Sequence, residues 1–296
     1  MSILAILILI LLYFAFASTR FVEALARFYD NRFHGALLAL MLIIPYVLVA
    51  LPTANANLTG FGLGLLKMVA YLLFPTLLLI FKPKGHPALD LYDILAVLGL
   101  WFPIEFDWLP QADAVLGSVS IPIPLLTAIV LGYLLFIVIR PLEMGYSYQL
   151  RGRDLLAAVQ AWGAFAIIGI PLGVAMGFIV WRFAPFNAGD WLLRLTMIYF
   201  LNALPEEMLF RGVIQNMIER RFGRTWQTLM VAALIFGLAH VDNATAHHAV
   251  PNWPYVIMAS FAGIAYGWAW RKSGKITGSA VTHTLVNFMW GVIFKG

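Results

Sequence analysis

The chain has 296 residues, of which 62% are hydrophobic and 11% are charged, against about 45–50% and about 25% in an ordinary soluble domain. A soluble globule of this length cannot bury so much apolar surface, so the composition excludes a soluble, disordered or coiled-coil protein. Because the chain has no cysteine, disulfides, thiol nucleophiles and cysteine-ligated metal sites are also excluded. The net charge of +5 is not gathered in a basic, aromatic-rich run, so we expect no nucleic-acid partner.

Ten apolar stretches follow one another, separated by short charged segments. A transmembrane helix needs about 20 apolar residues, so we predict an all-α, polytopic membrane bundle with eight to ten transmembrane helices. We therefore expect this protein to be multi-pass, to lie in the cell (plasma) membrane and to contact lipid. The stretches are residues 2–18, 36–51, 61–81, 94–104, 123–139, 155–181, 191–204, 226–240, 255–270 and 280–294.

The stretch 94–104 is short and is ended by Pro103 and Glu105, so it is either a span or a tilted or re-entrant piece. If all ten stretches cross, the basic residues gather in alternate loops, which then lie in the cytoplasm. If 94–104 does not cross, the orientation of everything before it is inverted.

Polar and ionisable residues are placed differently in the two parts of the chain. Before Leu155 the charges in the loops are typical of topology signals and anchors, whereas after Trp191 polar and ionisable residues occur within the apolar stretches. We therefore predict an accessory transmembrane region at 1–154 and a catalytic bundle at 155–296, with its core motifs at 191–290.

The first polar group in this bundle contains Glu206, Glu207 and Arg211. Glu207 and Arg211 are four residues apart, so they share one helix face and can form an ion pair. Glu206 is turned about 100° from Glu207 and is left free to face another group. Alternatively, both acids belong to an ordinary interfacial helix end.

Two further groups are His240, at the end of an apolar run, and His283 with Asn287, four residues apart. Alternatively, these are an interfacial histidine and a polar contact between helices. At 1.5 Å per residue, all these polar groups lie about 12–24 Å from the basic residues that mark one side of the membrane. They therefore converge near one depth, as independent helix contacts would have no reason to do.

A carboxylate, two imidazoles and a carboxamide form a plausible hydrolytic site. Desolvation disfavours the charged form of Glu206 and makes it a stronger base toward water. An imidazole can relay the proton, and a second imidazole with the Asn287 amide can donate hydrogen bonds to an oxyanion.

Three motifs resemble those of the CAAX prenyl protease and bacteriocin-processing (CPBP, or Abi) family of intramembrane endopeptidases: Glu206-Glu207-xxx-Arg211, Phe236-xxx-His240 and His283-xxx-Asn287. The resemblance covers about the last third of the chain. It implies catalytic roles in three pairs: Glu206 with His240 to activate water, His283 with Asn287 to stabilise the oxyanion, and Glu207 with Arg211 as support.

The resemblance leaves the role of a metal open, because family members have been described both as metalloproteases and as metal-independent glutamic proteases. Glu206, His240 and His283 would supply three ligands to a divalent metal such as zinc, with water as the fourth. The chain has no His-Glu-xx-His pair, and Asp242 is the sole carboxylate close in sequence to these histidines, which favours the metal-free mechanism.

The resemblance implies a membrane-associated protein or peptide substrate, either a prenylated CAAX-type protein or a small peptide. A non-proteolytic membrane scaffold or immunity factor of the same fold is the alternative function. A secondary transporter would show paired repeats with broken helices, and the sequence contains no such pairing.

Overall fold

The computed structural model describes residues 1–83, 85–116, 119–245 and 247–295. The chain divides into two compact units, Met1–Glu143 (unit 1) and Met144–Gly296 (unit 2). The segment from Met144 onward packs into unit 2. The Met144 carbonyl accepts hydrogen bonds from the Ile276 backbone N–H and from the Trp270 indole N–H, both at 3.1 Å.

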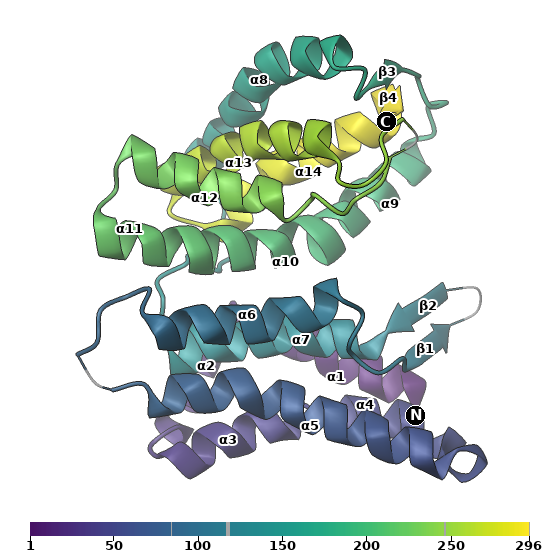
Figure 1. Ribbon diagram of the computed structural model, residues 1–296, viewed down its shortest axis with the longest axis vertical. Coiled ribbons are helices and arrows are strands. Elements are labelled where there is room, and N and C mark those ends of the chain that lie inside the picture. The colour runs from purple at the N-terminus through teal and green to yellow at the C-terminus, as the bar shows by residue number, and fades with distance from the viewer. Residues whose placement is uncertain (84, 117–118, 246, 296) are drawn as a thin grey trace. The chain divides into compact units, whose positions relative to one another are not determined.

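Unit 1 is built from helices and one β-hairpin (Figure 1). Several helices begin at capping residues, since the side chains of Asn31, Asn57 and Asp90 accept backbone N–H groups of the first turn. The elements are α1 (Ser2–Ala15), α2 (Thr19–Phe28), α3 (Arg32–Met41), α4 (Ile44–Ala50), 3₁₀-helical η1 (Leu51–Ala56), α5 (Leu58–Phe81), α6 (Leu91–Glu105), antiparallel β1 (Asp113–Leu116) and β2 (Val119–Pro122), α7 (Ile123–Tyr133) and π-helical η2 (Leu134–Ile139).

Unit 2 is also helical, with one short antiparallel ribbon formed by β3 and β4. Residues 188–222 are helical without interruption and include two π-helical segments. The elements are α8 (Gly152–Ala175), β3 (Val180–Trp181), α9 (Ala188–Met197), π-helical η3 (Ile198–Ala203), α10 (Leu204–Glu207), π-helical η4 (Met208–Gln215), α11 (Asn216–Phe222), α12 (Trp226–Leu238), α13 (Trp253–Ser273), α14 (Ile276–Ile293) and β4 (Phe294–Lys295).

The membrane character of the chain is supported by three helical segments that are long and apolar enough to cross a bilayer. They are Arg32–Ala50, which comprises α3 and α4, Leu58–Phe81 (α5) and Gly152–Ala175 (α8). The pair Ser2–Ala15 and Thr19–Phe28, bent by 102°, makes a fourth if it is one broken span. The expected eight to ten spans are therefore not confirmed among the described helices. Helix α6 is 15 residues long, contains Pro103 in its interior and ends at Glu105.

Helix α13 occupies the centre of unit 2 and packs against α8, α12 and α14 (Figure 1). Two glycines permit its close approach to α12. A Cβ atom on Gly263 would lie 3.1 Å from the Ala233 Cα, and one on Gly237 would lie 2.6 Å from the Val256 carbonyl oxygen. This approach brings the C-terminal end of α12, which leads to His240, close to the faces of α13 and α14.

Candidate active site

The acidic pair lies on the short helix α10, between the two π-helical segments η3 and η4. π-helical turns are rare, and they occur frequently at functional sites. In this helix, Glu206 is partly exposed, with 29% of its side-chain surface accessible, whereas Glu207 is fully buried. The two neighbouring carboxylates therefore have different surroundings.

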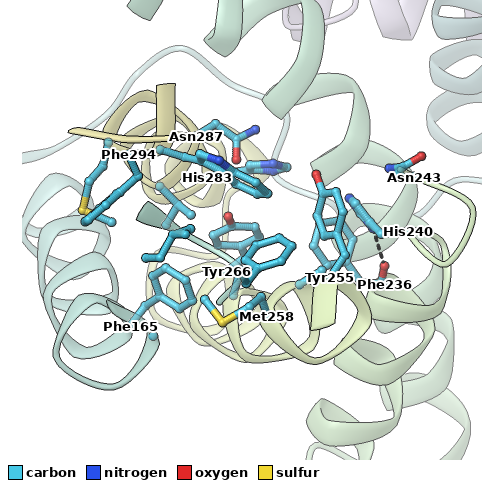
Figure 2. Close-up of a pocket in the computed structure, with 18 of the residues that line it drawn as sticks. Phe165, Phe236, His240, Asn243, Tyr255, Met258, Tyr266, His283, Asn287 and Phe294 are labelled. Atoms are coloured by element: carbon cyan, nitrogen blue, oxygen red, sulfur yellow. Dashed lines mark hydrogen bonds between the residues drawn. The ribbon is translucent and has the colours of Figure 1, made fainter. Parts of the chain in front are cut away.

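A cavity of about 180 Å³ lies inside unit 2 and brings four of the expected residues together. Its lining includes Glu206, His240, His283 and Asn287. Figure 2 shows the two histidines and the asparagine around it; His240 follows α12, whereas His283 and Asn287 lie on α14. The volume is sufficient for water molecules between these polar groups.

The Glu206 carboxylate has one engaged oxygen and one free oxygen. Oε1 accepts a hydrogen bond of 2.5 Å from the Asn202 side-chain amide. Oε2 is buried without a hydrogen-bond partner and lies 3.8 Å from His283 Nε2. Oε2 is therefore the oxygen that is available to a water molecule.

Glu207 does not line the cavity but is a buried acceptor for three donors. Oε1 accepts from Arg211 Nη1 at 3.0 Å and from His283 Nδ1 at 2.9 Å, and Oε2 accepts from the Ser279 hydroxyl at 2.5 Å. The expected pairing of Glu207 with Arg211 is present. The contacts to Ser279 and His283 connect α10 to α14 and were not apparent from the sequence.

Arg211 lies beneath the cavity and is almost completely buried. Its guanidinium also donates to the Gly263 carbonyl oxygen at 3.2 Å and lies 4.2 Å from the centre of the Phe236 ring and 5.0 Å from that of Tyr266. Ion pairing, hydrogen bonding and cation–π contacts together compensate for the loss of hydration of this charge.

Both histidines are oriented through Nδ1. The Phe236 carbonyl oxygen lies 2.9 Å from His240 Nδ1, and Glu207 holds His283 Nδ1. Because a carbonyl oxygen and a carboxylate only accept hydrogen bonds, each Nδ1 carries the proton and each Nε2 is left for chemistry. The His283 ring stacks on Tyr266, with 4.4 Å between ring centres.

His240 and Glu206 make no direct hydrogen bond or ion pair in the described part of the structure, although both line the cavity. The His240 ring lies 4.9 Å from that of Tyr255, centre to centre, and Asn243 lies beside them (Figure 2).

Asn202 is a site residue that the sequence interpretation missed. It donates to Glu206 and accepts a hydrogen bond of 2.7 Å from the Asn287 amide, so it connects the carboxylate to α14. The Asn287 amide has two N–H groups, so one of them is not used in this hydrogen bond. The spacing of four residues between Asn202 and Glu206 is a signal that could have identified it.

The donor set of Glu206, His240 and His283 is chemically suited to zinc, and the fixed Nδ1 atoms are typical of metal-binding histidines. Glu207 supplies an orienting carboxylate that the sequence interpretation had not found for His283. Across the described residues, however, no three His, Asp or Glu side chains are arranged to hold a metal ion. In the observed geometry Glu206, His240 and His283 therefore do not form a metal site.

Comparison with known proteins supports the motif resemblance. Residues 188–289 match a family model described as Rce1-like, type II CAAX prenyl endopeptidase. The matched range begins at the first residue of α9, ends within α14 and contains all six expected site residues. No curated protein and no solved structure matches the chain. The family that residues 188–289 resemble is thus the Rce1-like CAAX protease family.

Proposed function

We propose that unit 2 is an intramembrane endopeptidase in which Glu206 and His240 activate a water molecule to hydrolyse a peptide bond. The main support is the unpartnered Glu206 Oε2 in a cavity that is also lined by His240, His283 and Asn287. In this proposal the whole chain lies in the plasma membrane and crosses it eight to ten times, and residues 1–154 form the accessory region.

The first step forms a bond between the water oxygen and the carbon of the scissile carbonyl, while Glu206 Oε2 accepts the proton of the water. His240 Nε2 lies in the same cavity and shares this proton. Collapse of the tetrahedral intermediate then breaks the C–N bond, and the proton passes to the leaving amine. Water is thus consumed, and one carboxylate and one amine are formed.

The oxyanion of the intermediate is stabilised by Asn287 and His283. Asn287 retains one amide N–H after its contact with Asn202. His283 Nε2 donates only when the ring carries both protons, because Nδ1–H is already directed at Glu207. Each donor to an oxyanion typically contributes about 2.7–4 kcal/mol to catalysis.

The substrate in this proposal is a membrane-associated protein or peptide, with a prenylated CAAX-type C-terminus as the first candidate. The rest of the cavity wall supports an apolar group beside the scissile bond, because it consists largely of aromatic and apolar side chains: Phe165, Phe178, Tyr255, Met258, Ala262 and Trp290.

The test is cleavage of a farnesylated reporter peptide by the purified full chain and by Glu206→Gln. Loss of a general base should reduce turnover by about 10²- to 10⁴-fold, with an unchanged thermal transition and membrane insertion. Asp190→Asn is the matched control, because Asp190 is an exposed acid on the same helical run. Undiminished cleavage by Glu206→Gln would remove the general-base assignment.

Two further measurements separate the alternatives. Mass spectrometry of membranes containing the wild type or Glu206→Gln detects native peptides cut only when Glu206 is intact, whereas a scaffold or immunity factor yields none. Metal analysis of the purified protein, with activity measured before and after chelation, distinguishes a glutamic from a metallo mechanism.

A further inference from the structure

Helix α5 in unit 1 carries one charged residue, Lys67, in an otherwise largely apolar sequence that is long enough to span a membrane. Lys67 is the tenth residue of the helix, about 14 Å along its axis from Leu58. A lysine at such a depth is energetically costly unless a partner or a polar cavity receives it.

No carboxylate forms an ion pair with Lys67 in the part of unit 1 that the structure describes. The buried Asp93 instead binds Lys82 and Arg140. The recorded contact of the Lys67 ammonium is with the Trp108 ring, 5.3 Å from its centre. A ring face stabilises the charge but accepts few of the three N–H groups, so Lys67 retains donors for a ligand.

A cavity of about 460 Å³ adjoins Lys67. It follows one face of α5, where Gly60, Gly64 and Lys67 succeed one another at helical spacing. A Cβ atom on Gly64 would collide with the hydroxyl group of Tyr46, so the absence of a side chain there leaves room for that phenol.

The polar groups of this cavity favour an anion. Lys67, Tyr46, Gln111 and Asn57 are among the residues that line it, and none of its described lining residues is an Asp or Glu. An ammonium with neutral donors around it is a typical setting for a phosphate oxygen. The lysine side chain also extends toward the N-terminal end of α5, the direction from which a headgroup would enter.

We propose that this cavity binds the phosphate of an anionic phospholipid, with Lys67 as its counter-charge. A lipid is favoured over a soluble anion because the site lies on a membrane-spanning helix. The neighbouring side chains of Leu63 and Leu66 are 55% and 65% exposed and offer apolar surface for an acyl chain. The site is independent of the proteolytic function proposed for unit 2.

The test is native mass spectrometry of the full chain in detergent with phosphatidylglycerol, phosphatidylcholine or inorganic phosphate added separately. The wild type should retain phosphatidylglycerol in preference to phosphatidylcholine. Lys67→Gln should weaken the phosphatidylglycerol complex by at least about tenfold, as expected for loss of a charge-assisted hydrogen bond. Lys67→Arg should retain it, and the control Arg27→Gln, which removes an exposed basic residue of α2, should leave it unchanged.

Equal retention of phosphatidylglycerol by Lys67→Gln and the wild type would overturn the proposal. Equal binding of the two lipids by the wild type would also overturn it, and this comparison requires no variant to fold. Displacement of phosphatidylglycerol by millimolar inorganic phosphate would assign the site to a free anion instead of a lipid.

Discussion

Replacing Asn202 by alanine is expected to slow peptide cleavage without unfolding the protein. The side chain donates to Glu206 Oε1 at 2.5 Å and is itself held by Asn287 at 2.7 Å. Hydrogen bonds to charged groups contribute about 1.5–3 kcal/mol. If that energy serves to hold Oε2 toward the water, its loss lowers the rate by about 10- to 150-fold.

The assay measures kcat and KM for a farnesylated reporter peptide. The decrease should fall mainly on kcat, because Asn202 orients the base and is not expected to bind the ground-state substrate. Thr196→Ala is the control, since Thr196 is an exposed residue on the same helical run. A kcat within twofold of the wild type in a folded Asn202→Ala variant would refute the positioning role.

A double-mutant cycle extends this prediction to Asn287. Because Asn202 and Asn287 share one hydrogen bond, the effects of Asn202→Ala and Asn287→Ala should not be additive. The double variant should be less impaired than the product of the two single effects. Simple additivity would mean that the two carboxamides act separately.

Two predictions concern stability. Glu207→Ala leaves the Arg211 charge buried without its counter-ion, so it should destabilise the chain by about 3–5 kcal/mol in thermal or denaturant unfolding; a near-native transition would contradict this. In unit 1, burial raises the pKa of the Asp90 carboxyl, but hydrogen bonds from the Asp93 backbone N–H and from Lys82 lower it by more, below its usual 3.8. The stability that charged Asp90 contributes is complete above its pKa in the unfolded state and is lost as the pH falls through its lower pKa in the folded state. The thermal midpoint of the wild type should therefore fall more steeply between about pH 5 and pH 3 than that of Asp90→Asn. Equal slopes for the two proteins would contradict this prediction.

The candidate site was largely accessible from the sequence because its residues obey helical spacing. The four-residue interval puts Glu207 and Arg211 on the same helix face. The common depth of Glu206, His240, His283 and Asn287 predicts a shared pocket. The structure has the Glu207–Arg211 contact and a cavity lined by the other residues. Their catalytic roles remain predictions that the experiments above address.

Contacts between distant segments were not accessible in this way. Ser279 follows Glu207 by 72 residues, and its hydroxyl reaches the carboxylate only because α14 packs against α10. The π-helical segments on either side of α10 likewise have no evident sequence signal. The unit boundary at Met144 depends on hydrogen bonds to residues more than 120 positions later.

The number of spans illustrates a different limit. Composition establishes that the chain is apolar, but crossing a bilayer also depends on the length of each unbroken helix. The first apolar stretch ends as α1 at Ala15, and the chain then turns by 102° into α2. Helix α12, which precedes His240, has 13 residues and falls short of the usual length of a span. Hydropathy alone therefore overestimates how many such stretches are long straight helices.

The different surroundings of the two adjacent glutamates explain why one of them is suited to act as the base. Glu207 already accepts hydrogen bonds from Arg211, His283 and Ser279 and lies outside the cavity, so accepting a proton would disrupt contacts that hold α10 to α14. Glu206 uses one oxygen for Asn202 and keeps the other free inside the cavity. A proton on that oxygen breaks no hydrogen bond within the protein. The rotation of about 100° between neighbouring helical residues thus gives one carboxylate a structural role and leaves the other available for chemistry.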